Sequence, residues 1–417
     1  LCAIPFCYNQ FTTSEKDYMK SVELSLCFNP DQESTYLLEL LRSTADRSLA
    51  DVQVNIHPML WDDYKQEITM MALYNRGSDV SQVGFPLTDD LIAMNVLQPA
   101  SPQLLAKIGG EGGLHPTVRR IAQRHKTGLI WGLPWMVDPR ALFYWKDMVD
   151  AAGVNAETAF QTAENMQTAC QRMKDSGMET PWVLGMADKF VIIHSIVSWV
   201  WGKGGDFISP DDNRAIFLDK TALDGFEAYF RLAQYMPDAG RPLSVAVAKR
   251  LFVERKAAVT LGPYGSLNGF LAATSAEFHD LLGVALPPGP PLIAGSDLIV
   301  WHYSQKIDEI SRLLTVLFST NVQVKYAEYL GDLPVTNEAL DHLAKSTDPN
   351  VRTFITTLDK GRIFSTTKFA GMLEVHLAAT LTRLWADLYG HPPDNLREYL
   401  REGLDPVRSR FDALYGT

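Results

Sequence analysis

The alternation of apolar and polar positions in the first hundred residues predicts strands and helices in turn. Residues 22–28 (VELSLCF) alternate and are rich in residues that favour strands. Residues 34–45 place leucines on one side of a predicted helix, and residues 52–56 (VQVNI) predict a second strand. A helix that ends near Tyr74 and a strand at 79–85 follow. This β-α-β-α-β order indicates an α/β layer with a largely parallel sheet.

The rest of the chain predicts helices with a few short strands between them. Residues 190–201 are apolar with a period near 3.6, which predicts a buried helix. The other expected helices are 147–152, 156–177, 218–235, 307–330 and most of 336–417. The expected strands are the apolar runs 129–134, 142–145, 257–261 and 284–286. We expect 109–113 (GGEGG) to be a flexible loop and the proline-rich 287–291 to be a stiff connector.

Composition narrows the class of protein. A chain of 417 residues suggests two or three domains, and 46% hydrophobic with 21% charged residues is ordinary for a globular protein. The formal net charge is -11, and no cluster of Lys and Arg occurs, so we expect no nucleic-acid partner. No run of about 18 apolar residues occurs, so no transmembrane helix is predicted.

The four cysteines give little information on redox environment. They are Cys2, Cys7, Cys27 and Cys170, and their spacing does not resemble a zinc site. A Cys2–Cys7 bridge is one option, whereas a buried or free thiol is expected for the others. The first residues lack a charged segment and a long apolar run, so no signal peptide is expected within these residues.

Common catalytic and nucleotide-binding motifs are absent from the sequence. It contains no phosphate-binding loop, no GxSxG, no HExxH and no dinucleotide fingerprint after the first strand. The nine histidines are scattered. We therefore expect no enzyme, no cofactor and no metal site. A glycosidase with paired carboxylates stays open, because such pairing is spatial and acidic residues are plentiful.

Aromatic residues are the most informative chemistry in the sequence. Nine tryptophans occur, and several lie at the ends of predicted elements: Trp61, Trp131, Trp135, Trp145, Trp201 and Trp301. Sugar rings stack their apolar faces on flat aromatic side chains, while their hydroxyls bond to Asp, Asn, Glu and Arg. Tryptophans also fill protein cores, which is the more common use for any one of them.

Several patterns resemble, in order, the family 1 extracellular solute-binding proteins, the group similar to maltose-binding protein. The longest match is 132–153 (GLPWMVDPRALFYWKDMVDAAG), which resembles a long block of that family. Shorter matches are 61–64, 77–80, 201–206 (WGKGGD), 252–263, 286–300 and 326–334. Together they cover roughly residues 20–340. The sequence departs from the family pattern at Ser78, Glu254-Arg255 and Ala294.

The resemblance implies a two-lobed α/β fold, like that of periplasmic binding proteins, with the ligand in a cleft between the lobes. The chain would cross between lobes near 133–138, 292–296 and 333–336. Lobe one would comprise 20–135 and 293–334, and lobe two 136–292 and 335–417. Residues 1–19 would form an N-terminal extension. The crossings carry Pro or Gly, which suits hinges that absorb changes of the backbone.

The resemblance also implies a function. The protein would capture a small ligand, a mono- or oligosaccharide, and deliver it to the permease subunits of an ABC transporter without breaking a bond. It would be an extracytoplasmic monomer, either periplasmic or anchored by lipid at the cell surface. The alternatives are a non-sugar solute (a peptide, a polyamine or a phosphorylated polyol), a glycan-processing enzyme, or a sensor that does not transport.

The candidate ligand contacts are residues at the loops that would face the cleft. The expected stacking platforms are Trp61, Trp135, Trp201 and Tyr264. The expected hydrogen-bonding side chains are Asn29, Asp138, Arg140, Asp206 and Asp297. Gly295 and Ser296 would present backbone groups to the ligand. For Asp79 we favour a structural role at the start of its strand over a role in binding.

Overall fold

The computed structural model describes eleven stretches of the chain. They are residues 20–28, 34–44, 48–61, 63–124, 128–188, 190–210, 213–237, 241–364, 367, 369–389 and 393–414. Asn29, Cys2, Cys7 and the expected extension 1–19 lie outside these residues. Cys27 and Cys170 are buried free thiols, as the sequence suggested. Within the described stretches no helix is long and apolar enough to span a lipid bilayer.

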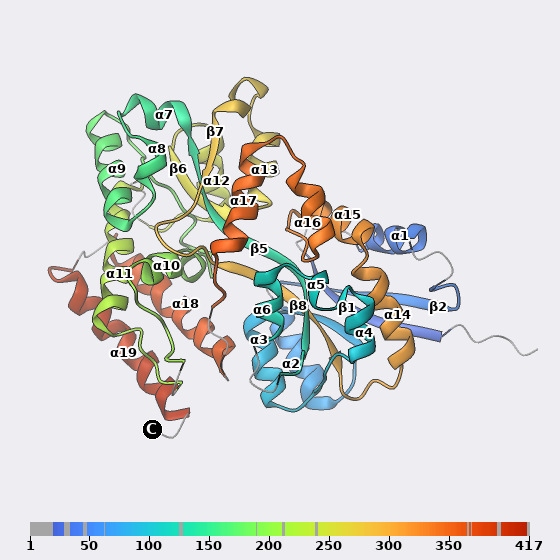
Figure 1. Cartoon of the computed structure of the whole chain (residues 1–417). Helices are drawn as coiled ribbons and strands as arrows, with labels where there is room; N and C mark the ends of the chain where they lie inside the picture. Colours follow the sequence, from blue (N-terminus) through green and yellow to red (C-terminus); the bar gives the residue numbers. More distant parts are fainter. Residues whose placement is uncertain are drawn as a thin grey trace, which may run out of the picture.

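One twisted sheet runs through the molecule in the order β2-β1-β3-β8-β5-β6, with β4 paired to β8 and β7 to β5 (Figure 1). The strands are β1 (Lys20–Phe28), β2 (Val52–Leu60), β3 (Val80–Gly84), β4 (Leu97–Gln98), β5 (Gly132–Trp145), β6 (Val259–Pro263), β7 (Leu282–Ala285) and β8 (Ile293–Trp301). The expectation of a largely parallel sheet is wrong beyond β1, β2 and β3, because β8 and β5 pair antiparallel with their neighbours. Helical crossovers enforce parallel pairing only within the first three strands.

Lobe one forms around the parallel strands. The apolar side chains of β1 at Val22, Leu24 and Leu26 are fully buried. The surrounding helices are α1 (Thr35–Thr44), α2 (Tyr64–Tyr74), α3 (Phe85–Ala93), α4 (Pro102–Lys107), α5 (Gly110–Gly113), α6 (Pro116–Ala122), α14 (Ile307–Leu317) and α15 (Thr320–Leu330). The glycine-rich loop expected at 109–113 is a helical turn, α5. The helix expected over 307–330 is two helices, because the chain turns at Phe318 and Ser319.

Lobe two is mainly helical. The helices within the ranges expected for lobe two are α7 (Lys146–Ala151), α8 (Ala156–Ala159), α9 (Ala163–Asp175), α10 (Val191–Gly202), α11 (Lys220–Phe230), η1 (Arg231–Tyr235), α12 (Val245–Val253), α13 (Ser266–Ala273), η2 (Ala276–Leu281), α16 (Asn337–Ala344), α17 (Pro349–Lys360), α18 (Ala370–Asp387) and α19 (Leu396–Leu414). The expected helix 156–177 is split, because the Thr162 hydroxyl accepts from the Asn165 N–H and starts α9. The expected burial of α10 is confirmed.

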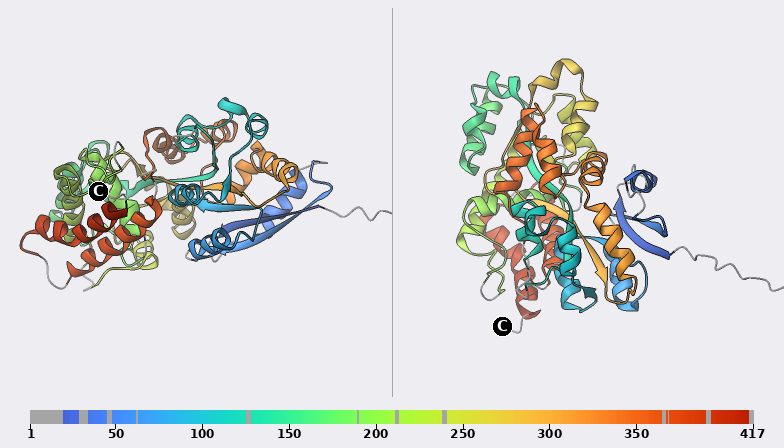
Figure 2. Two further views of the ribbon diagram at one scale, coloured as in Figure 1. Left: turned by 90° about the horizontal axis from the view of Figure 1, so that it is seen from below. Right: turned by 45° about the vertical axis from the view of Figure 1, so that its right-hand side comes forward.

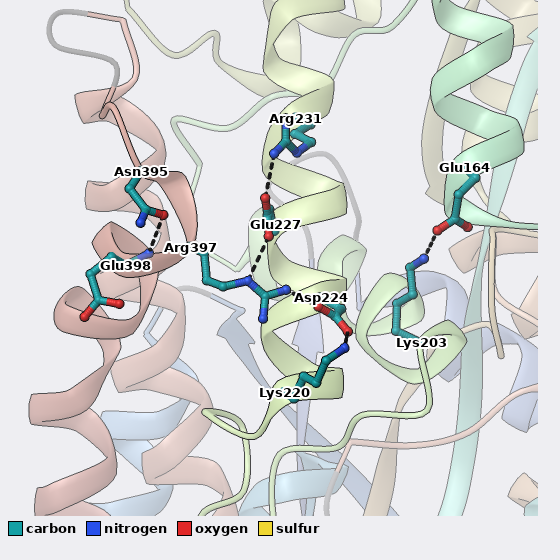
Figure 3. Close-up of polar contacts among 9 residues, drawn as sticks. All are labelled: Glu164, Lys203, Lys220, Asp224, Glu227, Arg231, Asn395, Arg397 and Glu398. Carbon is teal, nitrogen blue, oxygen red and sulfur yellow. Dashed lines mark hydrogen bonds and ion pairs between the residues drawn. The ribbon is translucent and has the colours of Figure 1, made fainter.

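A group of ion pairs holds the last helix against lobe two (Figure 3). The Arg397 guanidinium of α19 pairs with Asp224 and with Glu227 of α11, the latter at 3.1 Å from Nε to Oε2. Lys220 and Arg231 pair with the same two carboxylates from within α11. The left view of Figure 2 places the dark red helix α19 and the blue N-terminal strands on opposite sides of the molecule.

Strand β5 joins the two lobes. Its first half pairs with β8, and its second half pairs with β6 and β7. The sequence predicted two separate apolar runs here, because Asp138, Pro139 and Arg140 interrupt the apolar pattern in the middle of the strand. Asp138 and Arg140 are partly exposed on one side of the strand, whereas Pro139 between them is buried.

Four segments lie side by side where the lobes meet, and we call them the connecting layer. Val137 of β5 pairs with Leu333 on one side and with Gly295 of β8 on the other. Ile293 of β8 donates its N–H to the Arg362 carbonyl at 2.8 Å. The segments predicted as crossings therefore lie in one layer, together with a fourth segment at Arg362 that the sequence analysis did not single out.

Candidate functional site

The carboxyl ends of the parallel strands β1, β2 and β3 lie at one edge of lobe one, facing lobe two. Ligands of open α/β sheets bind beyond this edge. Trp61 follows β2 and is 36% exposed, with its ring edge against Tyr64 at 5.2 Å between centroids. Helix α2 then begins at Tyr64, and α3 begins directly after β3 at Phe85. The first turns of α2 and α3 thus form the lobe-one wall.

Two helix starts of lobe two face that wall. Phe190 precedes α10 and Phe369 precedes α18, and both have a left-handed backbone, at φ 67° and 68°. The Phe369 N–H donates to Asp90 of α3 at 2.8 Å. At Gly371 a Cβ would lie 2.8 Å from Asp90 Oδ2 and 3.3 Å from the Pro86 carbonyl oxygen, so glycine favours this close approach of α18 to α3. The lobes are therefore in direct contact here.

A chain of charged side chains crosses between the lobes. Lys65 Nζ of α2 lies 3.4 Å from Glu374 Oε2 of α18, and Glu374 Oε1 lies 3.2 Å from His194 Nε2 of α10. Arg140 contacts His194 Nδ1 at 3.5 Å and Asp138 Oδ2 at 3.1 Å. We call this set, together with Asp90 and Asp332, the interlobe seam.

Burial sets the electrostatics of the seam. It raises the pKa of Asp332 to about 8, with the nearby Asp138 carboxylate adding to the rise and Arg140 opposing it. It also raises the pKa of Asp138, although Arg140, His194 and the backbone of Tyr264 lower it. Burial alone would raise the pKa of Glu374, but the bond to His194 and the charge of Lys65 hold it below its usual value.

Some polar atoms of the seam have no partner among the described residues. Asp138 Oδ1 and Arg140 Nε are buried without a hydrogen bond. Buried polar atoms are nearly always satisfied in folded proteins, so each such atom calls for an explanation. Asp138 Oδ1 can accept a hydrogen bond and Arg140 Nε can donate one, and the two residues lie two positions apart on β5. A polar solute with both a donor and an acceptor would satisfy these two atoms.

Tyr264, a predicted stacking platform, lies close to this region, and its backbone opposes the rise that burial causes in the pKa of Asp138. It follows β6, is 9% exposed, and packs edge-on against Phe354 at 5.1 Å. Burial raises the pKa of its phenol. Its neighbour Gly265 touches Gly331, where a Cβ on Gly265 would lie 2.7 Å from the Gly331 carbonyl oxygen. The structure thus brings Tyr264, Asp138 and Arg140 together.

Trp201 and Asp206 belong to a different interlobe region. Trp201 Nε1 donates to Asp206 Oδ1 at 3.0 Å, and the Arg362 guanidinium covers the indole ring at 4.7 Å. Asp206 lines a cavity of about 980 Å³ between α3 and α6 on one side and, on the other, Asp206, Ile208, Pro210, Asn213, residues 361–364 and Thr367. We call it the α3–α6 cavity. One face of Trp201 is therefore already occupied by Arg362.

The remaining candidates are packed inside the protein. Trp135 is fully buried against Phe318 and Tyr326. Asp297 is fully buried, and its Oδ2 accepts from Thr88 and from Arg124, each at 2.7 Å. In the conformation described here neither side chain faces a space between the lobes.

Gly295, Ser296 and Asp79 have structural contacts. Gly295 has φ 155°, and a Cβ there would lie 2.5 Å from the Met136 carbonyl oxygen. The hydroxyl of Ser296 accepts from Gln82 at 2.8 Å. Asp79 accepts from the Glu23 N–H, the Ser304 hydroxyl and Lys306, which agrees with the structural role favoured for it.

Five members of the seam were not among the candidates predicted from the sequence: Lys65, Asp90, His194, Asp332 and Glu374. Each lies on a helix or beside one, far along the chain from the others, so no local spacing connects them. The available sequence signal was a polar residue among apolar neighbours, and it is clearest for His194 within the apolar run 190–201. Among the residues described, no group of three metal-ligating side chains comes together.

This architecture, two α/β lobes on a shared connecting layer with a polar seam between them, is that of a solute-binding protein. A model of the family described as "Bacterial extracellular solute-binding protein" matches residues 49–324, about two thirds of the chain. The chain belongs to this family.

Individual relatives are distant in sequence. A chain of Brucella abortus (strain 2308), named only for a binding function, is 22% identical over 316 residues, which cover 71% of this chain and 72% of the relative. The sugar-binding protein MalE of Xanthomonas citri superposes with a TM-score of 0.80 at 18% identity, covering 95% of this chain and all of MalE. The GacH receptor of Streptomyces glaucescens, solved with acarbose, gives 0.74 at 17%, covering 94% and 99%.

A third structure is a solute-binding protein of Thermotoga lettingae bound to α-D-tagatose. It superposes with a TM-score of 0.72 at 17% identity and covers 94% of this chain and all of that one. At these identities the superpositions establish the shared two-lobed fold, and the expected fold class is confirmed.

Proposed function

We propose that the protein captures a mono- or oligosaccharide in the interlobe seam and delivers it to the permease of an ABC transporter. The observation that carries this proposal is the seam itself, which brings unpartnered donors and acceptors of β5 between two lobes of a solute-binding fold. Solved structures with the same fold hold acarbose and tagatose, which are carbohydrates. A polyhydroxylated ligand offers donors and acceptors to match.

The seam is preferred to the α3–α6 cavity for a topological reason. The seam lies beyond the carboxyl ends of β1, β2 and β3, where open α/β sheets bind ligands. The lobe-one wall of the cavity is instead α6 and the C-terminal half of α3, from Asp89 to Ala93. If the ligand binds in the seam, the predicted contacts that remain candidates are Trp61, Asp138, Arg140 and Tyr264. The other two, Trp201 and Asp206, would then stabilise the fourth segment of the connecting layer, at Arg362.

Closure of the lobes on the ligand would be the functional motion. The proposed lobes are 20–135 with 293–334 and 136–292 with 335–417, hinged at the connecting layer. Ligand contacts that exist only in the closed form supply the free energy of closure. A dissociation constant of about 1 μM would correspond to about 8 kcal/mol. The family is extracellular; within it, we propose a monomer that acts in the periplasm or at the cell surface and catalyses no reaction.

Isothermal titration calorimetry with a panel of saccharides tests this proposal. The panel would contain tagatose, maltose, laminaribiose and acarbose, and at least one should bind. Asp138→Ala and Arg140→Ala should weaken that binding by about tenfold or more, because each removes a buried polar contact. Arg397→Ala, far from the seam on α19, is the matched control and should bind as the parent does.

Two results would contradict the proposal. Binding of a peptide, polyamine or phosphorylated polyol in place of every saccharide would refute the carbohydrate ligand. Release of cleaved product during incubation with an oligosaccharide would show a glycan-processing enzyme instead.

A further inference from the structure

The lobe-two wall of the seam contains a site built for an ammonium group. Glu374 is 7% exposed, so its carboxylate is nearly removed from water. His194 bonds one carboxylate oxygen, and the second oxygen faces lobe one. The ring of Phe190 stands beside it and stacks on the His194 ring with 6.0 Å between centroids and 23° between planes.

Lys65 of lobe one fills this site. Its Nζ lies 3.4 Å from Glu374 Oε2 and 4.6 Å from the centre of the Phe190 ring. A carboxylate and an aromatic face together are the partners that proteins use for cations, because both attract positive charge. The ammonium that occupies the wall therefore comes from the opposite lobe, and it leaves the wall whenever the lobes separate.

Phe190 is held in a costly conformation to form this wall. Its left-handed backbone at φ 67° is unfavourable for a bulky side chain. Phe369 at the start of α18 has the same conformation. Strained residues persist where the surrounding structure requires them, and here both lie at helix starts that face lobe one.

We infer that the saccharide bound in the seam carries a protonated primary amine, which takes the place of the Lys65 ammonium between Glu374 and Phe190. This inference rests on the proposed function and specifies its ligand class as amino sugars. Lobe opening leaves the Glu374 carboxylate without its cation. A ligand amine takes the place of Lys65 on closure and restores the ion pair, whereas closure on a neutral sugar restores it only through Lys65 itself. The Lys65 side chain is 29% exposed and flexible, so it can swing to solvent.

Calorimetry with matched disaccharides tests the inference at pH 6.5, where a sugar amine is protonated. The probes are the β-1,4-linked disaccharide of glucosamine, its N-acetylated form, and cellobiose, which share the linkage and differ in the group at carbon 2. The amine disaccharide should bind at least about tenfold more tightly than the other two, the gain expected for a charge-assisted contact. Equal binding of all three would overturn the amine inference and leave the carbohydrate proposal standing.

Two variants assign the effect to the wall. Glu374→Gln should reduce the ratio of amine to neutral affinity to near one, because it removes the charge and keeps the shape. Lys65→Met should increase that ratio, because it removes the internal competitor, and Arg397→Ala should leave it unchanged. Thermal unfolding shows whether each variant is folded. If Glu374→Gln does not fold, the affinity ratio of Lys65→Met alone decides the inference. An unchanged ratio in Lys65→Met would refute the inference, while a failure of every saccharide to bind would refute the proposed function.

Discussion

At the scale of single residues, one glycine controls the geometry of the connecting layer. Gly295 has φ 155°, and a Cβ would lie 2.5 Å from the Met136 carbonyl and 2.7 Å from the Phe85 ring. Neither backbone nor a buried aromatic ring can move away at low cost. The position therefore couples the β5–β8 pairing to the start of α3.

Gly295→Ala should destabilise the protein by about 2 kcal/mol or more, because the backbone is unfavourable and the space is filled. A drop in melting temperature by calorimetry is the measurement. Gly112→Ala is the control, since Gly112 has open space around its Cβ position, and it should melt within about one degree of the parent. Equal melting temperatures of the two variants would show that the connecting layer accommodates the added methyl group at Gly295 without loss of stability.

Asp332 makes stability depend on pH. Its pKa is raised from 3.8 to about 8 in the folded protein, mainly by burial and then by Asp138. Between about pH 4 and pH 8 the folded state therefore binds more protons than the unfolded state, so stability falls as pH rises. Asp332→Asn should melt at a higher temperature than the parent at pH 8, and the difference should shrink toward pH 5. A difference that is constant across this range would contradict the assignment.

At the scale of elements, Arg397 is the main polar link between α19 and α11 (Figure 3). The guanidinium is 31% exposed and bridges two carboxylates, so water screens part of its attraction. Arg397→Ala should lower the free energy of unfolding by up to about 1 kcal/mol. Arg383→Ala, which breaks an exposed pair within α18, should change it by a few tenths at most. Urea unfolding measures both, and an equal loss would show that the bridge between helices adds nothing.

Element prediction from sequence succeeded where periodicity is strong. Strands β1 and β3 and helices α1, α2 and α10 follow the predicted ranges closely, whereas β2 continues four residues past its predicted end at residue 56. It failed at β5, because the middle of a strand that crosses between lobes faces polar surroundings and loses the apolar pattern. It also failed at 156–177 and 307–330, because the helical pattern of the sequence continues across a break in the helix. The break is marked by the Thr162 cap in the first range and by a turn at Phe318 and Ser319 in the second.

The candidate site was harder to predict for a related reason. Asp138 and Arg140 lie within a long recognisable block, and Tyr264 follows a predicted strand. Trp135 and Asp297 have the right chemistry and lie near the connecting layer, but they point into the interior, which only the packing decides. Glu374 and Lys65 belong to opposite lobes and are brought together by the tertiary fold alone.

At the scale of the whole molecule, the seam ties the two lobes together through Lys65. Lys65→Glu would place a second negative charge beside Glu374, and the repulsion should favour separated lobes. Small-angle X-ray scattering of the ligand-free protein should show a larger radius of gyration for this variant. Lys220→Glu reverses an exposed charge within lobe two and is the control. The same radius for both variants would show that Lys65 does not influence closure.

The antiparallel pairing of β3 with β8 also affects how the chain folds. Gln82 and Ser296 bond to each other although they are 214 residues apart in the chain. Lobe one therefore cannot complete its sheet until the whole excursion through lobe two has been synthesised. Long-range strand pairing is slow because the intervening chain must first be brought together. The newly made chain should consequently stay incompletely folded until β8 emerges, with the apolar strands β1 and β3 dependent on chaperones during that interval.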